Sequence, residues 1–447
     1  MTAPVRSGSR ALLATSLGFA VVQLDVSVVN VAVKPIGASL GGNVSGLQWV
    51  VNAYTLAFAA LILSAGALGD RVGAKRVFTA GFELFTAASV ACGLAPSLSV
   101  LIAARAVQGI GAAVLVPCSL TLLNHAYYDQ RARARAVGLW AAGASVALSA
   151  GPLVGGILIA SLGWRSIFFI NAPLGLAAIR LTVRYTSETT QSRDRGVDLP
   201  GQLIAIVALV SLSAATVGGG QHGFTHPPAL AGFAIAAAAM AGFVYIETHR
   251  AAPMLPLALF RSPTFSLTSA IGLLVNVAFY GIIFVFSLYF QTTLHYSALA
   301  TGLAFGPTTA AVLVANLVTG RLTGTFGTRA VMISASLLMA VSLGGLLVAG
   351  RGTAYGLIAA QLTGLGFGIG VVVPAMTSAL LGSVEKSRSG VASGTLNTAR
   401  QTGSAMGVAL FGSLAATNLV GGLRLSLLIS MALALAIAGL ATLVADD

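Results

Sequence analysis

The sequence predicts an all-α protein that crosses a membrane many times, with two similar six-helix halves and two further helices between them. Three observations lead to this fold class. Hydrophobic residues make up 57% of the 447 positions, and the mean hydropathy is +0.93. Apolar runs of about 20 residues, enough to cross a bilayer as a helix, recur along the chain and lack the polar–apolar alternation of barrel strands. Features of the first half also reappear, in the same order, in the second half.

The apolar runs predict fourteen membrane spans joined by short polar segments. The first run follows Arg6 and Arg10 and contains Asp25, so we interpret it as a retained membrane helix and not as a signal peptide. The longest polar segment, 186–200, is too short for a soluble domain. In chain order the expected spans are 11–33, 48–69, 77–95, 98–122, 135–161, 165–185, 199–218, 229–248, 264–292, 300–321, 330–349, 354–378, 390–417 and 423–445.

Two glycine-rich hinges relate the halves. The charged segment 66–76 lies between spans two and three, and 320–329 is a weaker copy between spans ten and eleven. Spans four and twelve also share a Gly-x-Gly followed by a proline, Pro117 and Pro374. Spans one to six therefore match spans nine to fourteen, an arrangement typical of transporters. The predicted units are the first half, 1–185, a linker with two extra helices, 186–263, and the second half, 264–447.

Lys and Arg are concentrated in alternate connecting segments. The segments expected on the opposite side hold only four of them, Lys34, Arg165, Arg351 and Arg424. The positive-inside rule then predicts that both termini face the cytoplasm, with the protein in the cytoplasmic (inner) membrane. The net charge of +13 does not come from a basic soluble surface, so no nucleic-acid partner is expected.

Several motifs resemble those of the major facilitator superfamily, in its fourteen-span drug:proton antiporter branch. The hinge matches the signature loop of the superfamily, and 24–32 resembles the branch's motif in span one. Ala147 replaces the first glycine of the span-five antiporter motif, and Ser27 replaces a threonine of span one. The matching positions in spans four, five and thirteen are Arg105, Gln108, Gly109, Gly111, Gly151, Pro152, Gly155, Gly156, Asn397, Arg400, Gln401, Gly403 and Gly407.

Asp25 is the candidate proton carrier, because only Asp25 and Glu83 are acids well inside the expected spans. A carboxylate at that depth must pair with a cation, face water or be protonated. Arg105 is its expected partner, and a static ion pair that fixes the helices is the alternative to the coupling role of Asp25. For Arg105 the alternative is a set of bonds to backbone carbonyls around span one. Glu83 lies close enough to its span end to reach the basic hinge.

The hinge and span five are expected to act in the conformational change. The resemblance implies a latch that stabilises the outward-facing state, made by Gly66, Asp70, Arg71, Gly73, Lys75 and Arg76. The small residues Ala147, Gly151, Gly155 and Gly156, with Pro152, form a face suited to close packing against span ten. Ordinary helix packing is the alternative for this face.

Polar and aromatic residues within the spans are candidates for lining a substrate cavity. They are Asn30, Trp49, Asn52, Tyr54, Gln108, Trp140, Asn276, Tyr280, Asn397, Arg400 and Gln401.

The sequence contains no enzyme signature, no nucleotide-binding loop and no metal-ligand pattern, so neither an enzyme nor a cofactor is expected. The proton gradient is the expected energy source. The preferred function is proton-coupled export of small amphiphilic drugs or secondary metabolites by alternating access. The alternatives are a proton-coupled carrier of one metabolite and a non-transporting sensor or lipid-linked membrane component.

Overall fold

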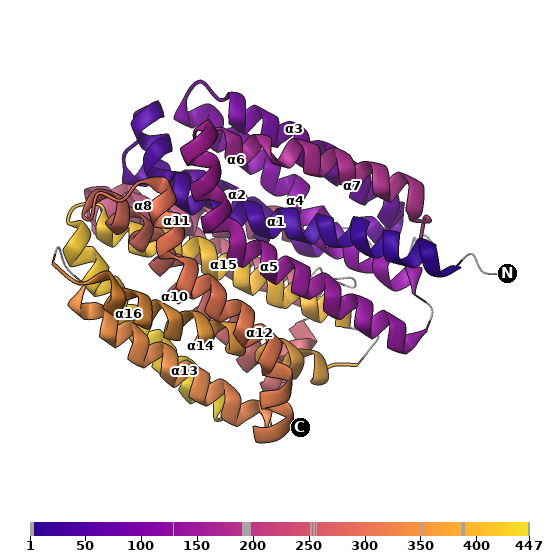
Figure 1. Cartoon of the computed structure of the whole chain (residues 1–447). Helices are drawn as coiled ribbons and strands as arrows, with labels where there is room; N and C mark the ends of the chain where they lie inside the picture. Colours follow the sequence, from indigo (N-terminus) through magenta and orange to yellow (C-terminus); the bar gives the residue numbers. More distant parts are fainter. Residues whose placement is uncertain are drawn as a thin grey trace.

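The computed structural model contains only helices and their connections in the part of the chain that it describes, residues 4–127, 129–189, 198–250, 253, 255, 257–349, 352–385 and 389–445. Both termini lie at the same end of the molecule, which we call the terminal end; the opposite end is the far end (Figure 1). The elements are α1 (Pro4–Leu40), α2 (Val44–Val72), α3 (Ala74–Leu94), α4 (Leu98–Ala126), α5 (Gln130–Leu162), α6 (Ser166–Phe169), α7 (Asn171–Tyr185), α8 (Leu199–His222), α9 (Pro227–His249), η1 (Leu257–Arg261), α10 (Pro263–Thr292), α11 (Ala298–Ala304), α12 (Gly306–Phe326), α13 (Thr328–Gly345), η2 (Leu346–Val348), α14 (Tyr355–Gly382), α15 (Ser389–Ala415) and α16 (Leu419–Ala441).

Thirteen helical stretches among the described residues are long and apolar enough to cross a membrane. Three of them combine consecutive elements, namely α6 with α7, α11 with α12, and α13 with η2. The fourteenth expected span, 390–417, corresponds to α15, whose 27 residues are sufficient in length but too polar to qualify. α15 packs among α2, α8 and α10, and this interior position shields its polar side chains from lipid.

Polar caps and glycines set where the helices begin and end. Asn43 and Asn418 accept hydrogen bonds from the first-turn amides of α2 and α16, at 2.9 and 3.0 Å, and so satisfy donors that a helix leaves free. Gly73 separates α2 from α3 with a φ of +110°, and Gly327 separates α12 from α13 with a φ of +80°. These φ values favour glycine, and they place equivalent sharp turns in the two predicted hinges.

The two halves repeat one pattern of helix packing. In the first half α1 packs on α5 and α7, and α4 packs on α2 and α3. In the second half α10 packs on α15 and α16, and α14 packs on α12 and α13. The predicted repeat of spans one to six in spans nine to fourteen accounts for this correspondence. Residues 190–197, within the expected linker, and Arg351 lie outside the described residues.

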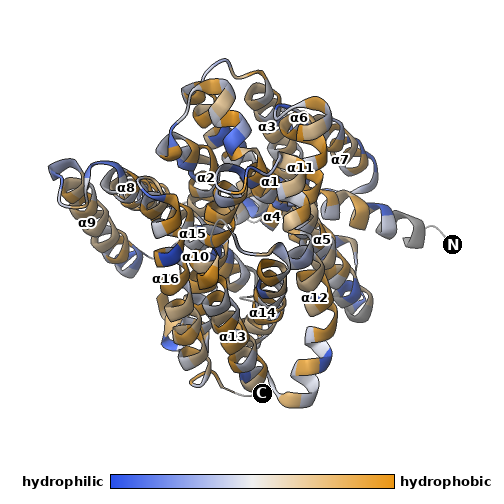
Figure 2. Cartoon of the chain, turned by 60° about the vertical axis from the view of Figure 1, so that its left-hand side comes forward, coloured by the Kyte–Doolittle hydropathy of each residue, from blue (hydrophilic) through white to orange (hydrophobic). Residues whose placement is uncertain are grey.

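The two extra helices, α8 and α9, pack against each other at the side of the molecule, with α9 outermost (Figure 2). α8 touches both α2 of the first half and α15 of the second, so it covers the seam between these two helices. Gln202 at the start of α8 donates to the carbonyl of Ala60 at 2.6 Å and accepts from Ser64 at 2.5 Å. Ser413 of α15 donates to the carbonyl of Thr216 at 2.9 Å.

Contacts between the halves close the far end. Gln48 of α2 donates to the carbonyls of Val408 and Ala409 on α15, at 2.9 and 2.7 Å. On the other side of the interface, Gln291 of α10 donates to the α1 carbonyl of Val31 at 3.2 Å, and its own carbonyl accepts from Lys34. α5 meets α11 at the same end. The described part of the chain therefore has a closed far end.

Candidate functional site

Asp25 lies at the centre of a buried polar network inside the first half. Its Oδ2 forms an ion pair with Nη1 of Arg105. Its Oδ1 accepts from Gln108 Nε2 at 2.8 Å and from Asn171 Nδ2 at 3.0 Å. Asp25 is 0% exposed and Arg105 1%. Removing a carboxylate from water costs several kcal/mol unless cations and donors replace the lost water, and here they do.

Arg105 has several partners that hold its guanidinium in place. Its Nε donates to the carbonyl of Val50 at 3.1 Å, and its Nη1 also donates to Gln108 Oε1 at 2.7 Å. The guanidinium carbon lies 4.2 Å from the centre of the Tyr54 ring. Arg105 is thus paired with the carboxylate and also bonded to a backbone carbonyl, which belongs to α2 and not to span one as in the alternative. Arg105 therefore connects Asp25 of α1 with α2 and α4.

The sequence analysis missed two members of the network. Ser89 Oγ of α3 accepts from Gln108 at 2.7 Å and from Asn171 of α7 at 3.3 Å, and both residues are almost fully buried. They bring α3 and α7 into the same network as Asp25. A survey of all polar residues within the first six spans, rather than of the charged ones alone, would have selected them.

A central cavity of about 450 Å³ lies between the halves, on the side of α1 away from Asp25. It is walled by α1, α5, α10, α12, α14 and α15, and it extends from Asn30 and Ser149 to Leu381 and Ser393 near the terminal end. Aromatic side chains such as Phe19 and Trp140, stacked with ring centres 4.3 Å apart, form part of the wall. The cavity suits an amphiphilic molecule, because apolar walls alternate with amide and hydroxyl groups.

Six of the eleven cavity candidates line this cavity: Asn30, Trp140, Asn276, Tyr280, Asn397 and Arg400. The other five do not. Tyr54 and Gln108 belong to the Asp25 network, and Trp49 packs on a small apolar cluster that includes Leu56 and Leu209. Asn52 and Gln401 are buried outside the lining, with side-chain atoms that have no hydrogen-bond partner. Spans that are apolar on every face give no signal of which side faces the cavity, so sequence could not separate these two groups.

The hinge binds the segment that follows α7. Glu188 accepts from the backbone amides of Lys75 and Arg76 at 2.9 and 3.2 Å, where α3 begins. A carboxylate is favoured at this position because the amides of a helix N-terminus are free and positively polarised. Lys75 Nζ donates to the carbonyls of Val183 and Thr186, at 2.9 and 2.8 Å. Sequence reasoning did not select Glu188, because its contact depends on how the chain returns from α7.

The remaining hinge residues lie at the end of α2. Gly66 faces α4, where an added Cβ would come 3.7 Å from Cβ of Pro117. Asp70 is half-buried and Arg71 is exposed. An added Cβ at Gly73 would lie 2.6 Å from the carboxylate of Glu188 and would displace it, and the φ of +110° itself favours glycine. The latch role of these residues stays a prediction.

The small residues of α5 serve two contacts. Gly151 and Gly155 face α1, and an added Cβ at Gly155 would lie 2.8 Å from Val28. Gly156 faces the second half, where an added Cβ would lie 2.9 Å from the carbonyl oxygen of Ala298 and 3.1 Å from Cα of Leu299 on α11. Ala147 is half-buried, and Pro152 lines the central cavity. Because these glycines have no side chains, α5 can pack closely against α1 in its own half and against α11 in the second half.

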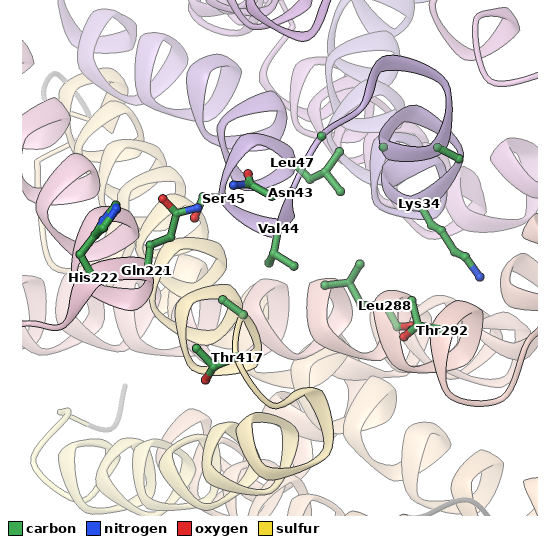
Figure 3. A pocket seen from close by; sticks show the side chains of 14 residues that line it. Lys34, Asn43, Val44, Ser45, Leu47, Gln221, His222, Leu288, Thr292 and Thr417 are labelled. Atoms are coloured by element: carbon green, nitrogen blue, oxygen red, sulfur yellow. The ribbon is translucent and has the colours of Figure 1, made fainter.

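A second hollow of about 800 Å³ lies at the far end, above the closed contacts (Figure 3). Lys34 of α1 and His222 of α8 stand at opposite edges of it, and Leu288 and Thr292 of α10 lie between (Figure 3). Between this hollow and the central cavity, Ser287 and Gln291 of α10 donate hydrogen bonds to backbone carbonyls of α1. The hollow is therefore separate from the cavity in this conformation.

Comparisons with known proteins agree with this architecture. Residues 15–408 match the Major Facilitator Superfamily. The chain is 38% identical to the methylenomycin A resistance protein of Streptomyces coelicolor, over 92% of this chain and 88% of that protein. It is 37% identical to the multidrug resistance protein Stp of Mycobacterium tuberculosis, over 91% of this chain and 75% of that protein.

The fold is also that of a solved transporter. A D-xylose-proton symporter superposes with a TM-score of 0.72 over 97% of both chains at 12% sequence identity, a likeness that concerns the fold alone. The predicted all-α fold class, with two six-helix halves and two helices between them, is confirmed. The family consists of transporters and not enzymes. The chain belongs to the Major Facilitator Superfamily, in the branch that contains these resistance proteins.

Proposed function

We propose that the protein is a proton-coupled antiporter that exports amphiphilic drugs or secondary metabolites across the cytoplasmic membrane by alternating access. The observation that best supports this proposal is that the two faces of α1 meet different sites. One face carries the buried Asp25–Arg105 ion pair, and the opposite face lines the amphiphilic cavity. The names of the resistance proteins to which the chain is 37–38% identical support an export function. The unequal distribution of Lys and Arg supports cytoplasmic termini.

With the terminal end in the cytoplasm, the structure corresponds to an inward-facing state. The central cavity extends toward the terminal end, and the contacts of Gln48 and Gln291 close the far end. A substrate from the cytoplasm would enter the cavity in this state. Opening toward the outside requires these far-end contacts to break.

The proposed coupling runs through the two faces of α1. Protonation of Asp25 removes the charge that Arg105 neutralises, which leaves a buried cation without its partner at a cost of about 3–5 kcal/mol. Rearrangement of α1 against α4 and α7 relieves that cost. Because Gln23, Ser27 and Asn30 of the same helix line the cavity, the rearrangement also changes the substrate site. Proton and substrate can therefore affect each other without sharing a binding group.

Proton flux in liposomes tests this function. The wild-type protein is reconstituted with a pH-sensitive dye inside the vesicles and exposed to a panel of amphiphilic compounds. We expect compound-triggered proton movement that is lost in Asp25→Asn. Glu83→Gln is the matched control, because Glu83 is an exposed acid of α3 outside the network, and its flux should persist.

Each other outcome has a defined meaning. Flux that persists in Asp25→Asn would assign the proton to another group. If thermal unfolding curves show that both proteins are folded and neither produces proton flux, the single-metabolite carrier or the non-transporting component would be favoured.

A further inference from the structure

We propose that Arg400 is an anion-binding residue of the central cavity and that the preferred substrates are amphiphilic organic acids. The inference rests on the proposed export function, to which it adds a substrate class. It comes from the charges that line the cavity and from the partners of Arg400.

Arg400 is the only charged side chain among the described residues that line the cavity. The lining contains no Asp or Glu, and Asp25 is held on the far side of α1 by Arg105. A cationic substrate would find no carboxylate in this cavity and would be repelled by Arg400. An anionic substrate would find one cation in a partly apolar site, where charge attraction is stronger than in water.

Arg400 has no ion-pair partner within the described part of the chain. Its Nε is buried without any hydrogen-bond partner, in contrast to Arg105, whose Nε and Nη1 are both bonded. Arg400 is half-buried at the cavity wall, and a guanidinium nitrogen out of contact with water is normally bonded, since it otherwise loses its hydration without compensation. A carboxylate, sulfonate or phosphate group would satisfy Arg400 with paired hydrogen bonds.

The surroundings of Arg400 also provide groups suited to an acid. Tyr280 of α10 lines the same cavity as Arg400 and offers a hydroxyl group. Asn276 lies one turn from Tyr280 on α10, and Asn397 lies one turn from Arg400 on α15. Both line the same cavity and offer amide groups. The stem of Arg400 lies over Gly272, where an added Cβ would come 3.4 Å from Arg400 Cγ. The glycine thus leaves space for the side chain between α10 and α15.

The rest of the cavity accommodates the apolar part of such a molecule. Phe279, Phe305 and Ile369 add to the wall formed by Phe19 and Trp140. The exit side is also free of carboxylates, because the described lining of the far-end hollow contains Lys34 and His222 but no Asp or Glu. An organic anion would therefore meet no fixed negative charge among the described lining residues of either space.

A pair of fluorescent probes tests the proposal without any need for transport. Anilinonaphthalene sulfonate is an amphiphilic anion, and phenylnaphthylamine is the same ring system without the sulfonate. Each is titrated into protein in lipid nanodiscs, with empty nanodiscs subtracted. Energy transfer from tryptophan reports binding, and Trp140→Phe should reduce that signal more than Trp49→Phe or Trp164→Phe, because Trp140 lines the site.

We expect Arg400→Gln to weaken binding of the sulfonate about tenfold or more and to leave binding of the neutral probe unchanged. Arg400→Lys should retain part of the affinity, because it keeps the charge but loses the paired geometry. Arg261→Gln is the control for removal of a positive charge, since Arg261 is an exposed residue outside the cavity lining.

Three results would overturn the proposal: no binding of the sulfonate to wild-type protein, equal sulfonate affinity in Arg400→Gln, or a parallel loss of both probes, which indicates a structural role. Failure of the export function is distinguishable. Asp25→Asn should still bind the sulfonate, so binding through Arg400 without proton flux would contradict the antiport proposal alone.

Discussion

At the scale of single residues, two arginines within the spans differ in their partners: Arg105 is buried and Arg400 is half-buried. Arg105 is saturated by a carboxylate, a backbone carbonyl and an aromatic face, whereas Arg400 faces the cavity with a free Nε. Arg105 is therefore suited to stabilise an arrangement of helices that depends on the charge of Asp25. Arg400 is suited to bind a ligand. The same residue type serves both purposes because burial magnifies the effect of each partner.

Asn171 gives a test of the network at this scale. Its amide donates to Asp25 and so stabilises the ionised carboxylate; Asn171→Ala removes that bond. With that donor lost, Oδ1 keeps only its bond to Gln108 and α7 is no longer tied to the carboxylate, so proton-coupled transport should be slower. The measurement is the initial transport rate in proteoliposomes at a fixed pH.

Asn52→Ala is the matched control for this prediction, because Asn52 is a buried asparagine with no hydrogen-bond partner for its side chain. Its transport rate should equal that of the wild type. An unchanged rate in Asn171→Ala would show that the Asn171 contact does not support the role of Asp25.

At the scale of helices, α8 acts as a bridge between the halves. It is bonded to α2 through Gln202 near the terminal end and to α15 through the carbonyl of Thr216 nearer the far end. Because the far-end contacts must open during transport, the bond to Ser413 lies at a place of relative movement. The bonds of Gln202 lie at the opposite end of α8.

Gln202→Leu should lower the thermal unfolding midpoint of the purified protein. The substitution removes the two hydrogen bonds that Gln202 makes, to Ser64 and to the carbonyl of Ala60, a loss of about 1–3 kcal/mol. The same substitution at Gln221, an exposed residue of α8, should have little effect. Equal midpoints for the two variants would contradict a stabilising role for the contact of α8 with α2.

At the scale of the whole molecule, alternating access predicts that the central cavity and the far-end hollow change their exposure to the two sides of the membrane. Ser378 lines the central cavity and Thr417 lines the far-end hollow, and both are exposed. The native cysteines, Cys92 and Cys118, are buried and should not react. Labelling of single added cysteines with an impermeant maleimide can therefore follow each hollow separately.

With the terminal end in the cytoplasm, Ser378→Cys should react in inside-out vesicles and Thr417→Cys in right-side-out vesicles. A condition that favours the outward-facing state, such as low external pH, should reduce labelling of Ser378→Cys. Labelling of both positions from the cytoplasmic side would refute the orientation. Labelling of Ser378→Cys that never changes would refute the exchange of states.

The sequence predicted the features that depend on length, composition and repetition. Apolar runs of bilayer length identified the helices, and the paired hinges identified the repeat, with Gly73 and Gly327 at equivalent turns. The partnership of Asp25 and Arg105 followed from the cost of isolated charges in a membrane. Contacts that depend on helix rotation were not predictable: Asn30 and Asn52 look alike in sequence, yet one lines the cavity and the other is buried elsewhere.

The position of α8 has a consequence for how compounds dissolved in the bilayer reach the protein. Of the two seams between the halves, α2–α15 is covered by α8, whereas α5 and α12 present exposed apolar side chains such as Leu139 and Leu317 at the other. With the terminal end in the cytoplasm, lateral entry from the cytoplasmic leaflet would then be restricted to the flank of α5 and α12. Lipids and lipophilic compounds would approach Trp140 and Phe19 first, before meeting the charge deeper between α10 and α15. The added helices α8 and α9 thus make the two flanks of a scaffold built from two similar halves unequal in the plane of the membrane.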